Sequence, residues 1–278
     1  MFVGMASDRT EPDFTATTCE RFADLHRTGT FLIPNPCDIG TARLLEAMGF
    51  VALATTSSGY AATLGRGDMS LERDELVAHV ASLAGAVSIP INVDAERCYG
   101  DTPTEVGDTV RRLAEAGASG ISIEDWDPAA GQIDPIGEAA DRVRAAADGA
   151  HASGVLLTAR AENHLHGIND IGDTVNRLRA YVYAGADVIY APGLKTEEDY
   201  AKVVELGVPV NALLLNGGPT VQQLTEWRVR RISTGGALTA FAQGAFVAAA
   251  QQLLDHGMYQ PSSVLASKAL VEAAFRKR

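Results

Sequence analysis

The sequence predicts a (β/α)8 barrel, the TIM-barrel class of α/β fold, and three observations support this prediction. Short apolar runs alternate with amphipathic segments through most of the 278 residues, as in parallel strands joined by helical crossovers. The runs number eight, which is the number of strands in such a barrel. The chain has no linker rich in proline, serine or charge, so we expect a single domain over residues 1–278.

The expected strands and helices follow one another in regular order. We expect strands at residues 31–33, 51–55, 89–94, 119–124, 155–160, 187–190, 208–213 and 229–233. We expect helices between them at residues 39–48, 70–86, 103–116, 135–150, 169–184, 196–205 and 220–227. Glycine follows the expected helix in four of these units, where it can adopt the left-handed conformation that ends a helix: Gly49, Gly117, Gly185 and Gly207.

Additional helices are expected before and after the barrel. Residues 12–28 should form a leading helix, and residues 236–256 and 262–276 should form two closing helices. The first closing helix is apolar nearly all round, with large side chains such as Phe241 and Phe246. A helix without a polar face is buried in a large core or by another subunit. We therefore expect the chain to associate with itself as a dimer or a tetramer.

An open, doubly wound sheet is the second architecture that the alternation permits. That fold often carries a glycine-rich turn after its first strand, where it binds a dinucleotide. In this chain the segment Pro34-Asn35-Pro36-Cys37-Asp38 follows the first expected strand instead. The closed barrel is therefore the favoured architecture.

Composition and charge argue against two classes of partner. The chain has 23 lysine and arginine residues against 35 aspartate and glutamate residues, a formal charge of −12 at pH 7. Binding to a phosphate backbone needs clustered base, so we expect no nucleic-acid partner. The most apolar stretch, residues 237–254, is interrupted by glycine and glutamine, so we expect no membrane span there.

The cysteines and the first residues of the chain indicate its compartment. Cys19, Cys37 and Cys98 are too few and too scattered for a disulfide framework or a zinc knuckle. The first residues contain neither a basic segment nor a long apolar segment, so no secretory signal is expected. We therefore expect reduced cysteines and a cytoplasmic protein.

Charged side chains gather at the carboxyl ends of three successive expected strands. Asp94 and Glu96 share one face of the third strand. Glu124 ends the fourth strand and Arg160 ends the fifth, so all four should meet at the rim where barrels carry their chemistry. Carboxylates at such short distances repel one another unless a cation lies between them. Oxygen ligands suit Mg²⁺ or Mn²⁺, so the set predicts such a site, unless the acids only cap helices or pair with arginine.

An ordered set of short motifs relates the sequence to a known family. The set runs over residues 30–240 and includes Asn35-Pro36-Cys37-Asp38, Thr55-Thr56-Ser57-Ser58-Gly59, Gly65-Arg66-Gly67-Asp68, Val93-Asp94-Ala95-Glu96, Gly120-Ile121-Ser122-Ile123-Glu124-Asp125 and Ala184-Gly185-Ala186-Asp187. By these motifs the chain resembles the phosphoenolpyruvate mutase/isocitrate lyase superfamily. Within it, the chain resembles the branch of carboxyphosphonoenolpyruvate phosphonomutase and oxaloacetate decarboxylase. The resemblance implies a (β/α)8 barrel whose eighth helix is exchanged between subunits.

The resemblance also implies which residues hold a metal ion. Asp94 matches the direct ligand of the Mg²⁺ ion that these enzymes use. Asp68, Glu96 and Glu124 match ligands that act through water, and Glu124 is also expected to take part in catalysis.

A second group of matching residues is implied to hold a small carboxylate substrate. Ser58, Gly59 and Tyr60 match the segment that holds the substrate carboxylate. Arg160 matches the arginine that steadies the substrate oxygens, and Asn211 matches a further polar position at the end of the seventh strand. Of these residues, Tyr60 and Arg160 are also expected to be catalytic.

Departures from the family pattern narrow the expected reaction. Isocitrate and methylisocitrate lyases carry a cysteine motif after the fourth strand, whereas residues 125–135 here contain no Cys, Lys or His. The Lys and Asn of phosphoenolpyruvate mutase are also missing from that loop. We therefore expect a Mg²⁺-dependent lyase that cleaves a C–C bond of a small 2-oxo or 2-hydroxy acid. Decarboxylation or retro-aldol cleavage would proceed through a metal-stabilised enolate.

Three alternatives stay open. A phosphonomutase or phosphonopyruvate hydrolase of the same superfamily would act on a P–C bond. A phosphate-binding barrel of another kind would use the glycine-rich segments Gly217-Gly218 and Gly235-Gly236. A barrel that has lost its activity would serve as a binding or assembly subunit. Glu96 and Cys98 favour this last alternative, because the family usually has Asp and Gly there.

Overall fold

The computed structural model describes residues 17–258 and 265–276. Each of the eight predicted runs contains a short strand: β1 (Phe31–Ile33), β2 (Leu53–Ala54), β3 (Ile91–Asp94), β4 (Gly120–Glu124), β7 (Leu156–Arg160), β8 (Val188–Tyr190), β9 (Val210–Leu213) and β10 (Arg231–Ser233).

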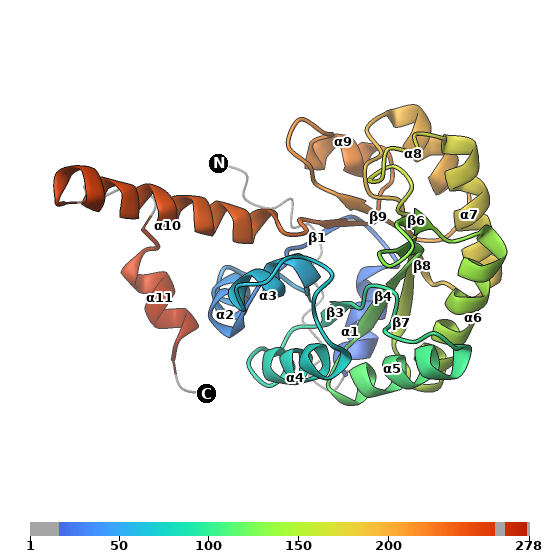
Figure 1. Ribbon diagram of the computed structural model, residues 1–278, viewed down its shortest axis with the longest axis horizontal. Coiled ribbons are helices and arrows are strands. Elements are labelled where there is room, and N and C mark those ends of the chain that lie inside the picture. The colour runs from blue at the N-terminus through green and yellow to red at the C-terminus, as the bar shows by residue number, and fades with distance from the viewer. Residues whose placement is uncertain (1–16, 259–264, 277–278) are drawn as a thin grey trace.

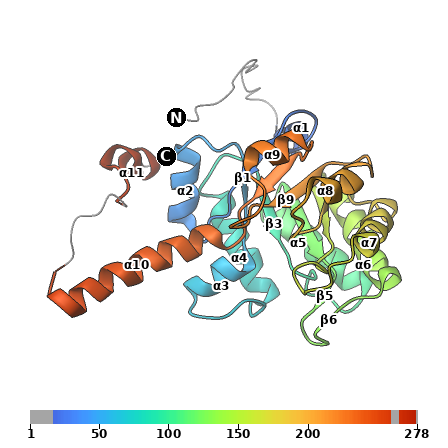
Figure 2. The same cartoon turned by 90° about the horizontal axis from the view of Figure 1, so that it is seen from above.

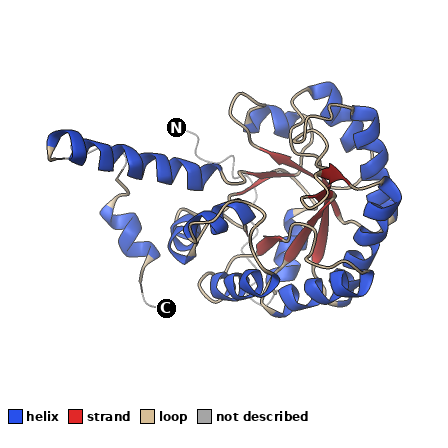
Figure 3. Cartoon of the chain, in the orientation of Figure 1, coloured by secondary structure: helices blue, strands red, loops and turns tan. Residues whose placement is uncertain are grey.

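These strands form one parallel sheet, and the helices surround it (Figures 1 and 3). The order in the sheet is β1-β10-β9-β8-β7-β4-β3-β2. Beyond the end of β1, the carbonyl of Pro34 accepts a 3.1 Å hydrogen bond from the amide of Ala54 in β2. The sheet is therefore a nearly closed barrel, as the sequence predicts.

The crossover helices lie close to their predicted positions: α2 (Ile39–Ala47), α4 (Arg73–Ala84), α5 (Pro103–Glu115), α6 (Ile136–Ala152), α7 (Ile171–Tyr183), α8 (Glu197–Val204) and α9 (Val221–Glu226). Helix α5 shows why the sequence forms a helix at such a position. The Thr102 side chain accepts from the Glu105 amide, while the Glu105 carboxylate accepts from the Thr102 amide, so both ends of this capping box are formed. Val106, Val110 and Leu113 recur at helical spacing and are buried against the barrel.

Helix α1 (Thr18–Leu25) forms part of the predicted leading helix, of which residues 12–16 lie outside the described residues. Its Phe22 is fully buried, and the rings of Phe22 and Phe31 both pack edge-on against His26. The capping box at Thr17 and Glu20 explains where the helix begins.

Two elements were not expected from the sequence. A short helix, α3 (Ser57–Thr63), follows β2 directly, with the Thr56 side chain as its N-terminal cap. The loop after β4 contains a two-stranded antiparallel hairpin, β5 (Trp126–Asp127) and β6 (Gln132–Ile133). Both elements lie at the carboxyl ends of the barrel strands, where they help to shape the site.

Helix α10 (Ala237–His256) extends away from the barrel (Figures 1 and 2). Thr239 is its one buried residue, while the side chains of Phe241 and Phe246 are 74% and 75% exposed. Its 20 residues are long and apolar enough to cross a membrane by length and composition alone. The expectation that no membrane span lies here therefore stays a prediction. Composition by itself does not distinguish such a span from a helix that a second subunit covers.

Helix α11 (Lys268–Ala274) forms the described part of the second closing helix, and residues 262–264 lie outside the described part of the chain. It returns toward the barrel and packs beside α2 (Figure 1).

Candidate active site

Arg160, at the carboxyl end of β7, is the centre of an acidic cluster. Its Nη1 lies 2.7 Å from Asp94 Oδ1 at the end of β3 and 3.1 Å from Glu124 Oε2 at the end of β4. Its Nε and Nη2 both lie 2.8 Å from Glu162 Oε1. The ring of Tyr190 packs 5.2 Å from the guanidinium carbon. The strand ends therefore converge as the sequence predicts, but around an arginine.

The charges of this cluster depend on one another. Burial alone lowers the pKa of Arg160, but the carboxylates of Glu162, Glu124 and Asp94 outweigh it and raise that pKa. Burial raises the pKa of Glu124 well above its ordinary value, although the positive charge of Arg160 opposes this effect. Arg160 is thus a permanently charged group at the carboxyl ends of the barrel strands, and three acidic side chains hold it in place.

Ser57 joins the two predicted metal ligands that lie on different elements. Its hydroxyl lies 3.1 Å from Asp68 Oδ1 and 3.2 Å from Asp94 Oδ2, and its amide donates to the same Asp94 oxygen at 3.2 Å. Asp68 also accepts a 2.9 Å hydrogen bond from the amide of Met69, whose φ of 58° is left-handed. The chain beyond α3 therefore brings Asp68 back to the rim beside Asp94.

Glu96 adds a buried carboxylate that forms no ion pair with the described residues. It is buried, its Oε1 has no hydrogen-bond partner, and its backbone is left-handed with φ 49°. Burial, followed by repulsion from Asp94 and Asp68, raises the pKa of Glu96 to about 8. Such an excess of buried carboxylate oxygen is what a divalent cation would relieve.

The carboxylates of this site fit a Mg²⁺ or Mn²⁺ ion that few protein atoms contact directly. Among the described residues, no three His, Cys, Asp or Glu side chains form a ready metal cage. Mg²⁺ usually keeps several waters and takes one or two carboxylates from the protein. Asp94 as the direct ligand, with Asp68, Glu96 and Glu124 acting through water, agrees with this coordination.

Ser58, Gly59 and Tyr60 all lie on α3, but they face different surroundings. Ser58 lines the cavity at the mouth of the barrel. Gly59 is buried, and a Cβ there would lie 2.5 Å from Thr56 Cγ2, so only glycine fits. Its amide already donates to Thr56 Oγ1 at 3.2 Å. Tyr60 stacks on the ring of His79 with 3.7 Å between the ring centroids, and it does not line the cavity.

The cavity at the mouth has a volume of about 200 Å³. Five of the predicted site residues line it: Asp68, Asp94, Ser58, Arg160 and Asn211. Asn211 is the second residue of β9 and lies deeper than the strand end on which the sequence placed it. A volume of this size admits only a small acid, because pockets for larger ligands measure roughly 300–1,000 Å³.

Sequence reasoning did not select three further residues that contact the site: Ser57, Tyr190 and Arg231. Period-two alternation could have found Arg231, because Arg231 and Ser233 share one face of β10 and Ile232 takes the other. The glycine pairs also differ in position, since Gly235 and Gly236 line the cavity and Gly217 and Gly218 do not.

The hairpin β5–β6 lies over the carboxyl end of β4 and is tied down by Arg97. Nη1 of Arg97 lies 3.1 Å from Asp127 Oδ2, and its Nη2 lies 2.6 Å from Asp134 Oδ2. The Trp126 ring stacks on the His166 ring, with centroids 3.4 Å apart. The hairpin is therefore anchored to loops on both sides, and its residues offer no Cys, Lys or His to the reaction.

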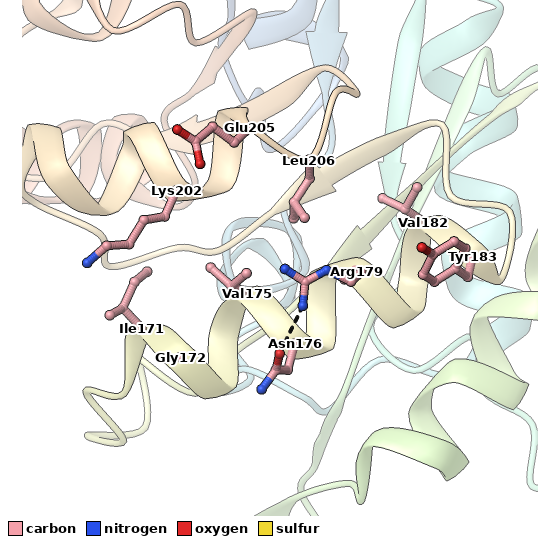
Figure 4. Close-up of a pocket in the computed structure, with 10 residues that line it drawn as sticks. All are labelled: Ile171, Gly172, Val175, Asn176, Arg179, Val182, Tyr183, Lys202, Glu205 and Leu206. Atoms are coloured by element: carbon pink, nitrogen blue, oxygen red, sulfur yellow. Dashed lines mark hydrogen bonds between the residues drawn. The ribbon is translucent and has the colours of Figure 1, made fainter.

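A larger groove of about 660 Å³ lies outside the barrel between α7 and α8. Figure 4 shows its lining, with Lys202 and Glu205 on one side and Asn176 and Arg179 on the other. The predicted catalytic residues are not among those that line it. The mouth cavity, although smaller, is the candidate active site because the charged strand ends meet there.

The chain is similar in sequence and in structure to several known proteins. The family model described as phosphoenolpyruvate phosphomutase matches residues 22–254. A protein of Burkholderia cenocepacia J2315, provisionally named a lyase/mutase, has a crystal structure with a TM-score of 0.88 and 42% sequence identity, covering 94% of this chain and 96% of that one. An uncharacterized protein of Mycobacterium tuberculosis is 34% identical over 87% of this chain and 92% of its own length.

A relative with a named activity is the oxaloacetate decarboxylase of Bradyrhizobium sp. (strain ORS 278). It is 29% identical over 87% of this chain and 88% of its own length. Oxaloacetate decarboxylation breaks a C–C bond, so this relative is a carbon–carbon lyase, the class of enzyme that the sequence predicts.

Proposed function

Because the chain belongs to the phosphoenolpyruvate phosphomutase family, we propose that it is a Mg²⁺-dependent carbon–carbon lyase of a small 2-oxo or 2-hydroxy acid. Decarboxylation and retro-aldol cleavage are the two reactions that the site favours. The observation that carries this proposal is the Arg160 guanidinium, held by three carboxylates directly beside Asp94 in a cavity of about 200 Å³.

Residues on one side of the cavity would bind the metal ion, and residues on the other side would bind the substrate carboxylate. On one side, Asp94 would hold the metal ion directly, and Asp68, Glu96 and Glu124 would hold its waters. When bound, a divalent cation polarises the 2-oxo group and lowers the energy of an adjacent negative charge. On the other side, Ser58 lines the cavity, and its hydroxyl, which lies 3.1 Å from Thr56 Oγ1, would donate to the substrate carboxylate.

Arg160 stabilises the charge that develops when the C–C bond breaks. The electron pair of that bond moves onto the carbon next to the carbonyl and is shared with the carbonyl oxygen, as an enolate. Arg160 can donate to this oxygen, and its position is fixed before the reaction by Asp94, Glu124 and Glu162. Preorganised donors of this kind commonly contribute about 100-fold or more to the rate.

The two tyrosines that could donate a proton at the end of the reaction differ in position. Tyr60 is stacked on His79 and is not among the residues that line the cavity. The Tyr99 hydroxyl is buried without a hydrogen-bond partner, and burial, together with the charge of Glu96, raises its pKa. We therefore assign protonation of the enolate to water, and we assign Tyr60 a packing role.

A screen of 2-oxo and 2-hydroxy acids with Mg²⁺ tests this function. Pyruvate with CO₂ would mean decarboxylation. Pyruvate with an aldehyde or a second acid would mean retro-aldol cleavage of a C–C bond. Release of phosphate from a phosphonate substrate would instead place the chain among the P–C enzymes that give the family its name. No product from any substrate of the panel would favour an inactive binding subunit.

We further propose that the protein forms a homo-oligomer in the cytoplasm. The exposed apolar side chains of α10 would be covered by a second copy of the chain, with the helix exchanged between subunits. The three cysteines are free, in keeping with a reducing compartment.

A further inference from the structure

Arg231, at the start of β10, is a buried cation without an acidic partner. The residue is only 2% exposed. Its Nε donates to Asn211 Oδ1 at 2.9 Å, its Nη2 to Thr158 Oγ1 at 2.9 Å, and its Nη1 to Asn92 Oδ1 at 3.4 Å. All three acceptors are neutral, and within the described part of the chain no carboxylate forms an ion pair with this guanidinium.

The residue beneath Arg231 is also uncharged. His26 Nδ1 lies 2.8 Å from the carbonyl of Phe22, to which it donates, so that Nε2 faces Arg231 Nη1 at 3.5 Å as an acceptor. Burial, followed by the charge of Arg231, lowers the pKa of His26 to about 3, so the ring stays neutral near pH 7. The aromatic rings of Phe22 and Phe31 close this layer from below.

A buried charge without a counter-ion is unfavourable, and proteins tend to keep one where function requires it. Arg160 shows the contrast, because it is buried but surrounded by three carboxylates. Burial lowers the pKa of Arg231, and the positive charge of Arg160 repels Arg231 and lowers that pKa further. Among the described residues, no acidic side chain therefore balances the charge of Arg231.

Arg231 lines the same cavity as Asp94 and Arg160, so an anion that enters the site can approach it. Ser122 also lines the cavity and is a neutral donor. Its Oγ accepts a 2.9 Å hydrogen bond from Asn92 Nδ2, so the hydroxyl proton of Ser122 stays available to donate. The floor thus offers one full positive charge and a hydroxyl, which is the chemistry that recognises a carboxylate.

We propose that Arg231 is a specificity-determining residue that selects acids carrying a second, distal carboxylate. The metal ion and Arg160 would hold the 2-oxo or 2-hydroxy end, while Arg231 would receive the other carboxylate. The inference rests on the proposed function, since it names the substrate class of the same site as a small dicarboxylate. It also explains why so polar a layer fills the inside of the barrel.

Calorimetric titration with racemic malate and with racemic lactate, both in Mg²⁺, tests the proposal, because the two 2-hydroxy acids differ by the distal carboxylate. The wild-type protein should bind malate about tenfold or more tightly than lactate, the value of one charged hydrogen bond. Arg231→Gln should bring the two affinities within about threefold of each other, and Arg231→Lys should keep most of the preference. Arg230→Gln is the matched control, because Arg230 is the adjacent arginine and donates to the carbonyl of Gly29 instead.

Oxalate, which has no distal group, separates this proposal from the proposed function. Oxalate should bind the wild-type protein and Arg231→Gln equally, and Asp94→Ala should lose it. Failure of oxalate to bind the wild-type protein would reject the proposed function. If oxalate binds but the malate preference is absent, or survives in Arg231→Gln, the role of Arg231 is wrong.

Thermal unfolding without ligand gives an independent reading. Arg231→Gln removes an unfavourable buried charge together with the hydrogen bonds to Asn211, Thr158 and Asn92, and these effects oppose each other, so its melting temperature should stay close to that of the wild-type protein. If Arg231→Gln and Arg231→Lys both unfold at much lower temperature and lose oxalate as well, Arg231 is a structural residue and the proposal fails.

Discussion

The guanidinium of Arg160 donates a 2.7 Å hydrogen bond to the carboxylate of Asp94. The group expected to hold the substrate and the group expected to hold the metal ion therefore form one ion pair. Glu124 Oε2, at 3.1 Å, shares the same guanidinium nitrogen. In the proposed function, a metal ion at Asp94 and a substrate at Arg160 would both exchange contacts with this cluster, so the binding of the one would be coupled to the binding of the other.

The first prediction concerns the metal ion. Asp94→Ala should abolish Mn²⁺ binding, because it removes the proposed direct ligand. Glu96→Gln and Glu124→Gln should only weaken binding by about tenfold to 100-fold, as expected for residues that act through water. Calorimetric titration with Mn²⁺ measures both effects, and an unchanged Mn²⁺ affinity in Asp94→Ala would reject the site.

The second prediction concerns the division of roles at Arg160. Arg160→Lys keeps the charge but loses the planar fork that meets Glu162 and Asp94 together, so it should lower kcat about 100-fold and change KM far less. Arg179→Lys, on the outer face of α7, is the matched control and should be fully active. Equal kcat values for Arg160→Lys and the wild-type protein would exclude the enolate mechanism.

The third prediction concerns assembly. Light scattering at micromolar concentration should report at least twice the 29.3 kDa mass of the chain. The double variant Phe241→Asp with Phe246→Asp places charge on the exposed apolar helix and should shift the protein to monomers. Tyr183→Asp, whose side chain is 79% exposed on α7, is the control and should leave the assembly intact. A wild-type protein that is monomeric would contradict the proposal.

The fourth prediction concerns stability in acid. Burial, followed by the charge of Arg231, lowers the pKa of His26 to about 3, whereas an unfolded histidine titrates near pH 6.5. Between these values the unfolded state binds the additional proton, so stability is lost as the pH falls from about 6.5 toward 3, at up to about 1.4 kcal/mol per pH unit.

His26→Gln should flatten this dependence, because glutamine does not titrate. The free energy of unfolding in urea, measured at pH 7 and pH 5, gives the comparison. Burial also lowers the pKa of His79 to about 4, so this loss of stability in acid should shrink in His26→Gln and shrink further when His79→Gln is added. An identical slope in the wild-type protein and the double variant would show that other groups control acid stability.

The sequence was most informative where one pattern repeats. The eight apolar runs each contain a strand, because the buried faces of a parallel barrel demand continuous apolar residues. The convergence of Asp94, Glu124 and Arg160 could also be predicted, since alternate residues at parallel strand ends must share one rim.

Elements that depend on tertiary contacts could not be predicted in the same way. Helix α3 contains two serines and Gly59, which are poor helix formers, and it forms because Thr56 caps it. The hairpin β5–β6 depends on the ion pairs of Arg97 with Asp127 and Asp134, which lie about 30 residues or more along the chain. The stacking of Tyr60 on His79 is a contact between two helices that sequence spacing does not reveal.

The most direct test of the account is product analysis with oxaloacetate and Mg²⁺, followed by nuclear magnetic resonance for pyruvate and CO₂. We predict release of both well above the spontaneous rate. Removal of Mg²⁺ by a chelator should abolish the enzymatic rate, and Arg160→Lys should reduce it about 100-fold. Oxaloacetate that decays at the same rate with the wild-type protein, with Arg160→Lys and in buffer alone would contradict decarboxylation. If no other 2-oxo or 2-hydroxy acid is cleaved faster with the protein than in buffer alone, the lyase assignment as a whole is contradicted.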